Sequence, residues 1–263
     1  MRNVVAKVSW RLLITVLFVF LWAPIVVVGV ISFDTSTYMR FPPDGFSFES
    51  YATVFRTPEF LTGFRVSLVI ALTVAVLAVT ISVCVALAIH RHGFRGRSAV
   101  SGLFLSPLLV PNIVLALALL LLFSPLGLTN SYPGLILAHL TICVPYAVRT
   151  VSVSLSTADA ACEDAARVLG ANGWATFRRV TLPLIRPGVV AGGVMSFLVS
   201  FDEAVLSLFL SGFHVTPLPV ELLHYVETQA GPEVAALSVV LIALSLVVMV
   251  VVERSLGLRR ALR

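Results

Sequence analysis

The sequence predicts an all-α integral membrane protein with six transmembrane helices and both termini in the cytoplasm. Three observations support this: an apolar composition, six long apolar runs, and an uneven distribution of positive charge between the loops. Of the 263 residues, 59% are hydrophobic and 12% are charged, and the mean hydropathy is +1.03. Soluble domains have roughly 45–50% apolar and about 25% charged residues. This composition therefore argues against a soluble protein.

Each apolar run is long enough to cross a bilayer, because about 20 apolar residues cover ~30 Å of hydrocarbon. The first run exceeds the roughly 7–15 apolar residues of a signal-peptide core, so we expect it to be retained. The third contains Pro107 and Pro111, which we expect to kink it. The expected spans are Leu12–Phe33, Val66–Ile89, Ala99–Phe123, Leu135–Leu155, Val189–Leu210 and Val234–Val252.

Positive charge gathers in one of the two sets of loops. All but three of the 18 Lys and Arg residues belong to this set. It comprises the N-terminus, residues 90–98 and 156–188, the tail after Val252, and Arg149 at its border. The opposite set holds Arg40, Arg56 and Arg65. Because Lys and Arg are retained on the cytoplasmic side, residues 156–188 are expected to form a cytoplasmic loop. This placement also argues against a nucleic-acid-binding face.

The external segment between the first two spans contains SFESYATVF, which is compatible with a short helix at the membrane surface or with a connecting loop that lies on the membrane. The three cysteines, Cys84, Cys143 and Cys162, have no metal-site spacing and are interpreted as packing residues. We expect no metal on this chain.

The loop at residues 156–188 is expected to fold as two short helices. Ser156 or Thr157 can cap the first, and Gly170 can end it in a left-handed conformation. Its apolar face comprises Ala161, Ala165, Val168 and Leu169, and Glu163 and Arg167 are expected to pair one turn apart.

The second short helix is expected to begin at Asn172 and to place Trp174 and Phe177 on one side. Leu182-Pro183 and Pro187-Gly188 are expected to break the chain before the fifth span. Two interpretations remain open: a helix lying on lipid headgroups, or a projection that docks into a groove of a cytosolic partner.

The spacing within this loop favours the docking interpretation. Asp164-Ala165-Ala166, three residues, Gly170, nine residues and Val180-Thr181-Leu182-Pro183 resemble the E-A-A-x3-G-x9-I-x-L-P motif. This motif belongs to permease subunits of binding-protein-dependent ABC importers. Asp164 and Val180 replace the usual Glu and Ile. The resemblance implies the type I importer permease fold, as a single transmembrane domain over residues 1–263.

In that family the loop forms a coupling helix that contacts the ATPase subunit. The residues implied here are Glu163, Asp164, Ala165, Ala166, Gly170, Trp174, Phe177, Leu182 and Pro183. The implied partners are an ABC ATPase dimer, a second and related permease subunit, an external solute-binding protein and membrane lipid. The family usually pairs two different permeases, which favours a heterodimer. The implied location is the bacterial inner membrane.

Catalytic motifs are absent from the sequence. It has no GxxxxGK[ST] loop, HExxH or GxSxG. We therefore expect a transport subunit rather than an enzyme, with no cofactor of its own. ATP and magnesium would be bound by the partner ATPase.

Two adjacent acids lie inside the fifth span. A carboxylate in mid-bilayer costs on the order of a few kcal/mol, so Asp202 and Glu203 suggest a pathway or partner. Helical spacing places Glu203 on a stripe of small and polar residues: Gly193, Ser196, Ser200, Ser207 and Ser211. The stripe can line a polar cavity or form a close seam with another helix. The hypothesis is that Asp202 or Glu203 favours a cationic cargo, with Ser196, Ser200 and Ser207 lining its pathway.

A similar polar face occurs on the fourth span. His139, Cys143, Tyr146 and Thr150 share one side, and packing is favoured there over cargo contact.

The segment SFDEAVLSLFLSG, followed by LPVELL, is similar to permease subunits of spermidine/putrescine-type importers. This resemblance implies a polyamine cargo, consistent with the two acids. Other cargoes stay open: an opine, an amino-acid-like amine or ferric ion. Rival classes are an ion-coupled secondary transporter with Asp202 and Glu203 as its proton site, an intramembrane enzyme, and a lipid-binding scaffold.

Overall fold

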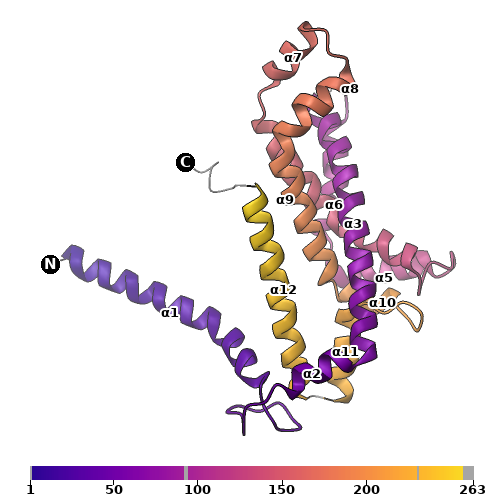
Figure 1. The fold of residues 1–263 in the computed structure, drawn as a ribbon. Coiled ribbons are helices and arrows are strands. Elements are labelled where there is room, and N and C mark those ends of the chain that lie inside the picture. Colours follow the sequence, from indigo (N-terminus) through magenta and orange to yellow (C-terminus); the bar gives the residue numbers. More distant parts are fainter. Residues whose placement is uncertain (1, 92–93, 230, 257–263) are drawn as a thin grey trace. The chain divides into compact units, whose positions relative to one another are not determined.

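The computed structural model describes residues 2–91, 94–229 and 231–256 (Figure 1). Its described part is helical, as the sequence predicts, and five helices are long and apolar enough to cross a membrane, or six if one bent pair counts as a single span. Arg259, Arg260 and Arg263 of the basic tail lie outside the described residues. The long helices are α1 (Arg2–Ile31), α3 (Pro58–Arg91), α6 (Tyr132–Thr157), α9 (Leu182–Phe201) and α12 (Pro232–Leu256).

The expected third span is broken rather than merely kinked. It consists of α4 (Arg97–Leu105), a 3₁₀ turn (Ser106–Leu109) and α5 (Asn112–Phe123), and the two parts meet at 105°. The break follows from Pro111, because the residue before a proline is driven out of the helical region. Val110 is accordingly extended.

The chain divides into two compact units. The larger, Thr62–Glu221 with Leu246–Arg263, is built on α3, α6 and α9, which lie side by side (Figure 1). It also holds α7 (Ala160–Val168) and α8 (Gly173–Thr176) at one end and α10 (Val205–Leu210) at the other. Its apolar core has two clusters. The first includes Ile70, Val74, Ala116, Leu119, Leu135, Ile142, Leu206 and Leu210, and the second Val83, Ala86, Val151, Leu155 and Ile185.

The smaller unit comprises Met1–Leu61 and Leu222–Ser245. The short helix expected in the external segment is α2 (Glu49–Arg56). The Phe33 ring packs on Phe48 and Tyr51, with ring centroids 5.3 and 5.2 Å apart. The apolar part of α1, Ser9–Ile31, is unburied within the chain.

Asp34 organises the loop between α1 and α2. Its carboxylate accepts hydrogen bonds from the Ser36 hydroxyl (2.5 Å), the Ser36 amide (3.1 Å) and the Asp44 amide (3.1 Å). The Ser36 hydroxyl is the main cause that lowers the pKa of Asp34, followed by local backbone amides and Arg40, while burial opposes them. The loop is therefore held by a carboxylate in its charged form.

Helix α11 (Leu218–Thr228) was not expected from the sequence. Ser67 accepts a hydrogen bond from the Leu218 amide at its start, at 2.9 Å. This contact ties the segment after α10 to α3.

Candidate functional site

Helix α7 has the start and end that a short isolated helix requires. The Asp159 side chain accepts the Ala161 amide at 2.9 Å and so caps the helix, in place of the expected Ser156 or Thr157, which still belong to α6. Gly170 has a φ of +88°. Its amide donates to the Arg167 carbonyl, and the Ala171 amide donates to that of Ala166, both at 3.0 Å. This pair of bonds is the Schellman motif, so the expected left-handed end is confirmed.

The second short helix begins as expected, at Asn172, whose side chain accepts the Ala175 amide at 2.8 Å. The Trp174 and Phe177 rings are 5.5 Å apart, which confirms that they share a side.

The expected break at Leu182-Pro183 and Pro187-Gly188 is wrong. A π-helical turn, Phe177–Thr181, continues into α9, which begins at Leu182 and runs through Pro187 to Phe201. Pro183 directly follows the π turn, where the regular pattern of α-helical hydrogen bonds is already interrupted. The loop therefore passes into the fifth span as continuous helical structure.

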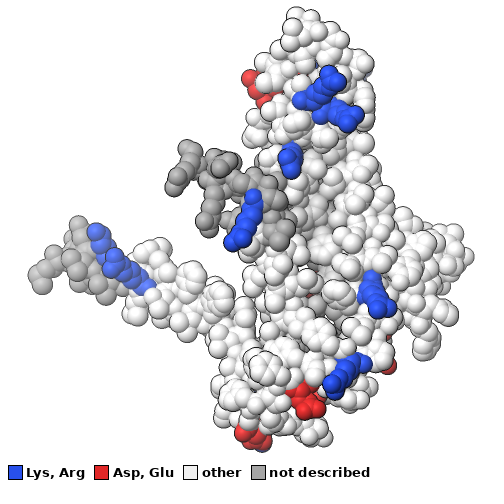
Figure 2. Space-filling model, in the orientation of Figure 1, with Lys and Arg blue, Asp and Glu red and all other residues white. Residues whose placement is uncertain are grey.

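The apolar residues of this loop point away from the rest of the chain. Val168 and Leu169 are 87% and 88% exposed, and Trp174 is 69% exposed. Ala161, Asp164 and Ala165 are also exposed. Figure 2 shows arginine side chains over the end of the larger unit that carries α8. The arginines in α7, in the π turn and in the first part of α9 are Arg167, Arg178, Arg179 and Arg186. Exposed apolar side chains beside cationic ones form a surface suited to a partner.

Glu163 does not pair with Arg167 as the helical spacing predicted. It is buried, and both of its carboxylate oxygens accept from Arg91 Nε at 3.1 Å. Arg91 Nη2 also donates to the Ala158 carbonyl at 3.4 Å. Arg167 contacts the exposed Asp164 instead, at 3.2 Å. Arg91 was not identified from the sequence, because nothing in its neighbourhood distinguishes it from the other arginines at span ends.

The two acids of the fifth span occupy different environments, because the helix does not run through them. Helix α9 ends at Phe201, and α10 begins at Val205. Glu203 is 8% exposed, and its Oε1 accepts the amides of Val205 and Leu206 at 2.9 and 3.0 Å, so that it caps α10. Asp202 is exposed. The continuous helix expected to Leu210 is therefore wrong: the Glu203 side chain takes amides that the helix would use.

Three serines of the stripe lie in a seam where α9 and α10 contact α6. Ser196, Ser200 and Ser207 are buried. His139 Nδ1 lies 2.8 Å from Ser200 Oγ, and Nε2 lies 3.1 Å from Ser207 Oγ. Ser196 and Cys143 exchange two contacts with each other's carbonyl at 3.5 Å. Within this chain the serines thus meet α6 rather than a cavity.

Glycines allow the seam to close toward its other end. A Cβ on Gly188 would lie 2.3 Å from that of Ser154, and a Cβ on Gly192 would touch Ala147. The expectation that His139 and Cys143 pack rather than contact cargo agrees with this geometry, while Tyr146 is exposed.

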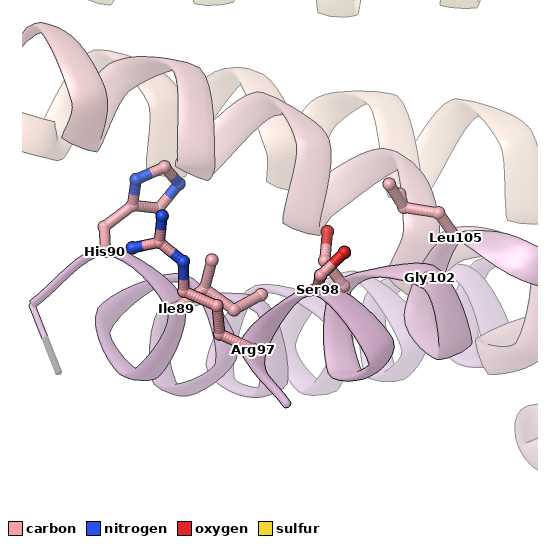
Figure 3. Close-up of a pocket in the computed structure, with 7 residues that line it drawn as sticks. Ile89, His90, Arg97, Ser98, Gly102 and Leu105 are labelled. Carbon is pink, nitrogen blue, oxygen red and sulfur yellow. The ribbon is translucent and has the colours of Figure 1, made fainter. Parts of the chain in front are cut away.

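A cavity of about 530 Å³ opens where α3 ends and α4 begins (Figure 3). His90, Arg97 and Ser98 line it, with Ile89, Ser101, Gly102 and Leu105. Its charged side chain is cationic, so it does not suit a positively charged cargo. The described residues include no group of three His, Cys, Asp or Glu side chains that could hold a metal ion.

A protein-family model matches residues 78–258, and it describes a binding-protein-dependent transport system inner membrane component. The spermidine/putrescine transport system permease protein PotC of Haemophilus influenzae is 36% identical over 89% of this chain and 91% of its own. The putrescine transport system permease protein PotI of Escherichia coli is 32% identical over 90% of this chain and 87% of its own.

Solved structures share the fold. A chain of a bacterial ABC transporter involved in import of the acidic polysaccharide alginate matches with a TM-score of 0.74 and 18% identity, over 97% of both chains. A second structure, of a bacterial alginate ABC transporter in complex with an alginate pentasaccharide-bound periplasmic protein, also has a TM-score of 0.74, with 16% identity over 96% of this chain and 94% of its own.

Proposed function

This chain belongs to the family of binding-protein-dependent transport system inner membrane components, and we propose that its cargo is a polyamine such as putrescine or spermidine. It is a multi-pass inner-membrane subunit of an ATP-driven importer, and its role is transport rather than catalysis. Its family implies an ATPase and a binding protein as partners. The second permease that completes the pathway is a related but different chain in this proposal.

The observation that carries the proposed coupling role is the fold of the Asp164–Pro183 segment. The exposed side chains of Val168, Leu169 and Trp174 form an apolar surface that nothing else in the described chain covers. A cytosolic ATPase with a matching groove would cover it, as helix-in-groove recognition requires. The basic side chains around this surface support a cytoplasmic location for it.

The cargo proposal rests on the named relatives and on the sign of the charge at the α9–α10 break. Asp202 is an exposed carboxylate next to a helix end, and a polyamine is a cation that such a group attracts. Glu203 is committed to capping α10, so Asp202 is the acid that remains available to cargo. Ferric ion, an opine or an amino-acid-like amine are the alternative cargoes that the experiment below separates.

In the proposed mechanism, ATP-driven closure of the ATPase dimer moves α7 and α8. This motion passes through the π turn into α9 and reaches the break that carries Asp202. Cargo released by the external binding protein enters the pathway while the break faces outward. The return of the helices to their inward-facing arrangement then exposes the cargo to the cytoplasm.

The test is reconstitution of the assembled transporter in lipid nanodiscs with its ATPase, second permease and binding protein. ATPase activity would be measured with putrescine, spermidine, octopine, ornithine and ferric citrate. The proposal expects stimulation by the polyamines. Stimulation only by another ligand would overturn the cargo assignment. Uptake that persists with a hydrolysis-deficient ATPase would instead favour an ion-coupled transporter.

A further inference from the structure

Arg91, the last residue of α3, contacts the one buried side chain of α7, the docking helix. Among the nine residues of α7, Glu163 is the one buried residue, and it is a carboxylate rather than an apolar group. Arg91 Nε reaches both of its oxygens at 3.1 Å. This ion pair joins α7 to α3, and α7 also lies close to α8 and to the π turn.

Arg91 also holds the junction that precedes α7. Its Nη2 donates to the carbonyl of Ala158, the extended residue between α6 and the Asp159 cap, at 3.4 Å. One guanidinium thus contacts both the helix and its entry. A planar group with several fixed donors suits this double contact better than an ammonium does.

The far side of this contact is firmly packed. Ala86 and Val83 of α3 are buried against Val151 and Leu155 of α6 and Ile185 of α9. A displacement applied to Glu163 would therefore reach the end of a helix that is packed along its length. The side chains of Arg91 and Glu163 are only 18% and 5% exposed, so solvent screens their attraction weakly.

We propose that Arg91 and Glu163 form a coupling strut, a pair of positioning residues that transmits movement of α7 to α3. The inference rests on the proposed function, because it assumes that α7 docks on the ATPase. A buried ion pair adds little net stability against an apolar replacement, but it fixes geometry. The strut makes α3 follow the docking helix when the ATPase closes, in addition to the direct path through α9. Without it, ATP would be hydrolysed without full movement of α3.

The test measures putrescine imported per ATP hydrolysed by the purified complex in nanodiscs. Arg91→Gln and Glu163→Gln should each lower this ratio about fivefold or more, the range of ordinary coupling energies. Arg91→Gln/Glu163→Gln should be no worse than either single variant. Arg91→Glu/Glu163→Arg should recover part of the ratio. The matched control is Arg95→Gln, which removes an exposed arginine from the same loop and should leave the ratio unchanged.

A purely structural pair would give a different pattern. It would lower the yield or the melting temperature of the complex while each remaining complex kept the wild-type ratio, and that result would overturn the proposal. Should the Gln variants fail to assemble, Arg91→Lys keeps the charge but loses the double contact, and it should assemble with an intermediate ratio. A wild-type ratio in Arg91→Lys would then count against the strut. A wild-type complex without polyamine-stimulated ATPase would instead contradict the proposed function.

Discussion

His139 in α6 and Ser207 in α10 are joined by a contact of 3.1 Å that crosses the break at the end of α9. The other ring nitrogen of His139 lies 2.8 Å from Ser200, on the near side of that break. One buried imidazole therefore contacts both α9 and α10, which are separate helices because of the break between them. This arrangement gives the break a defined geometry.

Replacing His139 with Leu should destabilise the protein by about 1–2 kcal/mol, because interhelical hydrogen bonds in membranes contribute roughly 0.6 kcal/mol each and at most ~1.7. The substitution would leave the hydroxyls of Ser200 and Ser207 without this partner. The measurement is thermal unfolding of the purified complex. Tyr146→Phe, at an exposed position of the same helix, is the control. An unchanged melting temperature for His139→Leu would show that the seam does not depend on the imidazole.

Gly188→Ala should be destabilising by about 1–3 kcal/mol, the usual cost of overpacking. The added Cβ would meet Ser154 Cβ at 2.3 Å and the Thr150 carbonyl at 3.1 Å. Gly102→Ala is the matched control, since nothing lies within 4 Å of its Cβ position. Melting curves of the two variants should diverge, with Gly102→Ala at or above the wild type. Equal melting temperatures would mean that α6 and α9 can separate at no cost.

Gly170→Ala should weaken binding of the ATPase, because a non-glycine residue in the left-handed region costs about 1–2 kcal/mol. The φ of +88° ends α7 and directs Val168 and Leu169 outward. The amount of ATPase that copurifies with the permease is the readout. Gly170→Asn should retain more of it, because Asn tolerates this conformation better. Equal retention by the Ala and Asn variants would show that the left-handed turn is dispensable.

Asp202→Asn and Glu203→Leu should separate cargo recognition from structure. Asp202 is exposed, so its neutral variant should raise the putrescine concentration needed for half-maximal uptake while the melting temperature stays constant. Glu203→Leu removes the acceptor of two amides and should cost about 0.5–2 kcal/mol, as loss of a helix cap does. Uptake kinetics and melting curves of both variants provide the check. Wild-type uptake by Asp202→Asn would remove this residue from the pathway.

Asp164→Ala tests whether the acidic position of the docking motif contributes to coupling. Its carboxylate is exposed and forms an ion pair with Arg167. An exposed pair of this kind contributes about 0–1 kcal/mol to stability, so folding should be unaffected. We expect lower uptake at normal expression, measured together with ATPase activity. Intact transport would show that the carboxylate is dispensable.

The Asp34 loop should lose structure at low pH. Because the pKa of Asp34 is lowered in the folded state, its contribution is present above the unfolded value of 3.8 and is lost as the pH falls through the folded pKa. Amide hydrogen exchange of residues 33–47, corrected for the intrinsic rate, should therefore accelerate as the pH falls through the folded pKa of Asp34. Asp34→Asn should show the faster exchange already at pH 7. Asp44→Asn, which removes only the exposed partner of Arg40, should exchange like the wild type.

The sequence predicted the helices well, because long apolar runs and caps are local signals. Asn172, Gly170 and the Trp174–Phe177 pair each depend on residues within a few positions. The partner of Glu163 could not be predicted in this way, since Arg91 is 72 residues distant in the chain. Helical spacing suggested Arg167 as the partner of Glu163, and only the tertiary structure shows that Arg91 is the partner.

The break at Glu203 was missed for a related reason. Six residues at helical spacing suggested one continuous face, and three of them, Ser196, Ser200 and Ser207, do meet α6. The pattern survives across the break because His139 contacts both Ser200 of α9 and Ser207 of α10. What the pattern could not reveal is that a carboxylate in such a run can satisfy the following amides itself.

Helices α6 and α9, with the loop that connects them, form a helical hairpin. Because the two helices are in close contact, we expect them to move as one rigid unit. Gly188 lies so close to Ser154 that an added Cβ would clash, and Gly192 lies beside Ala147, so α6 and α9 are in close contact over this stretch. From Thr157 to His139 the hairpin is about 27 Å long, at 1.5 Å per residue. A small tilt imposed at the loop end of these two helices is therefore transmitted to the polar break with little loss. The small side chains between α6 and α9 thus determine how completely a movement at the loop end of these helices is transmitted to the break within the membrane.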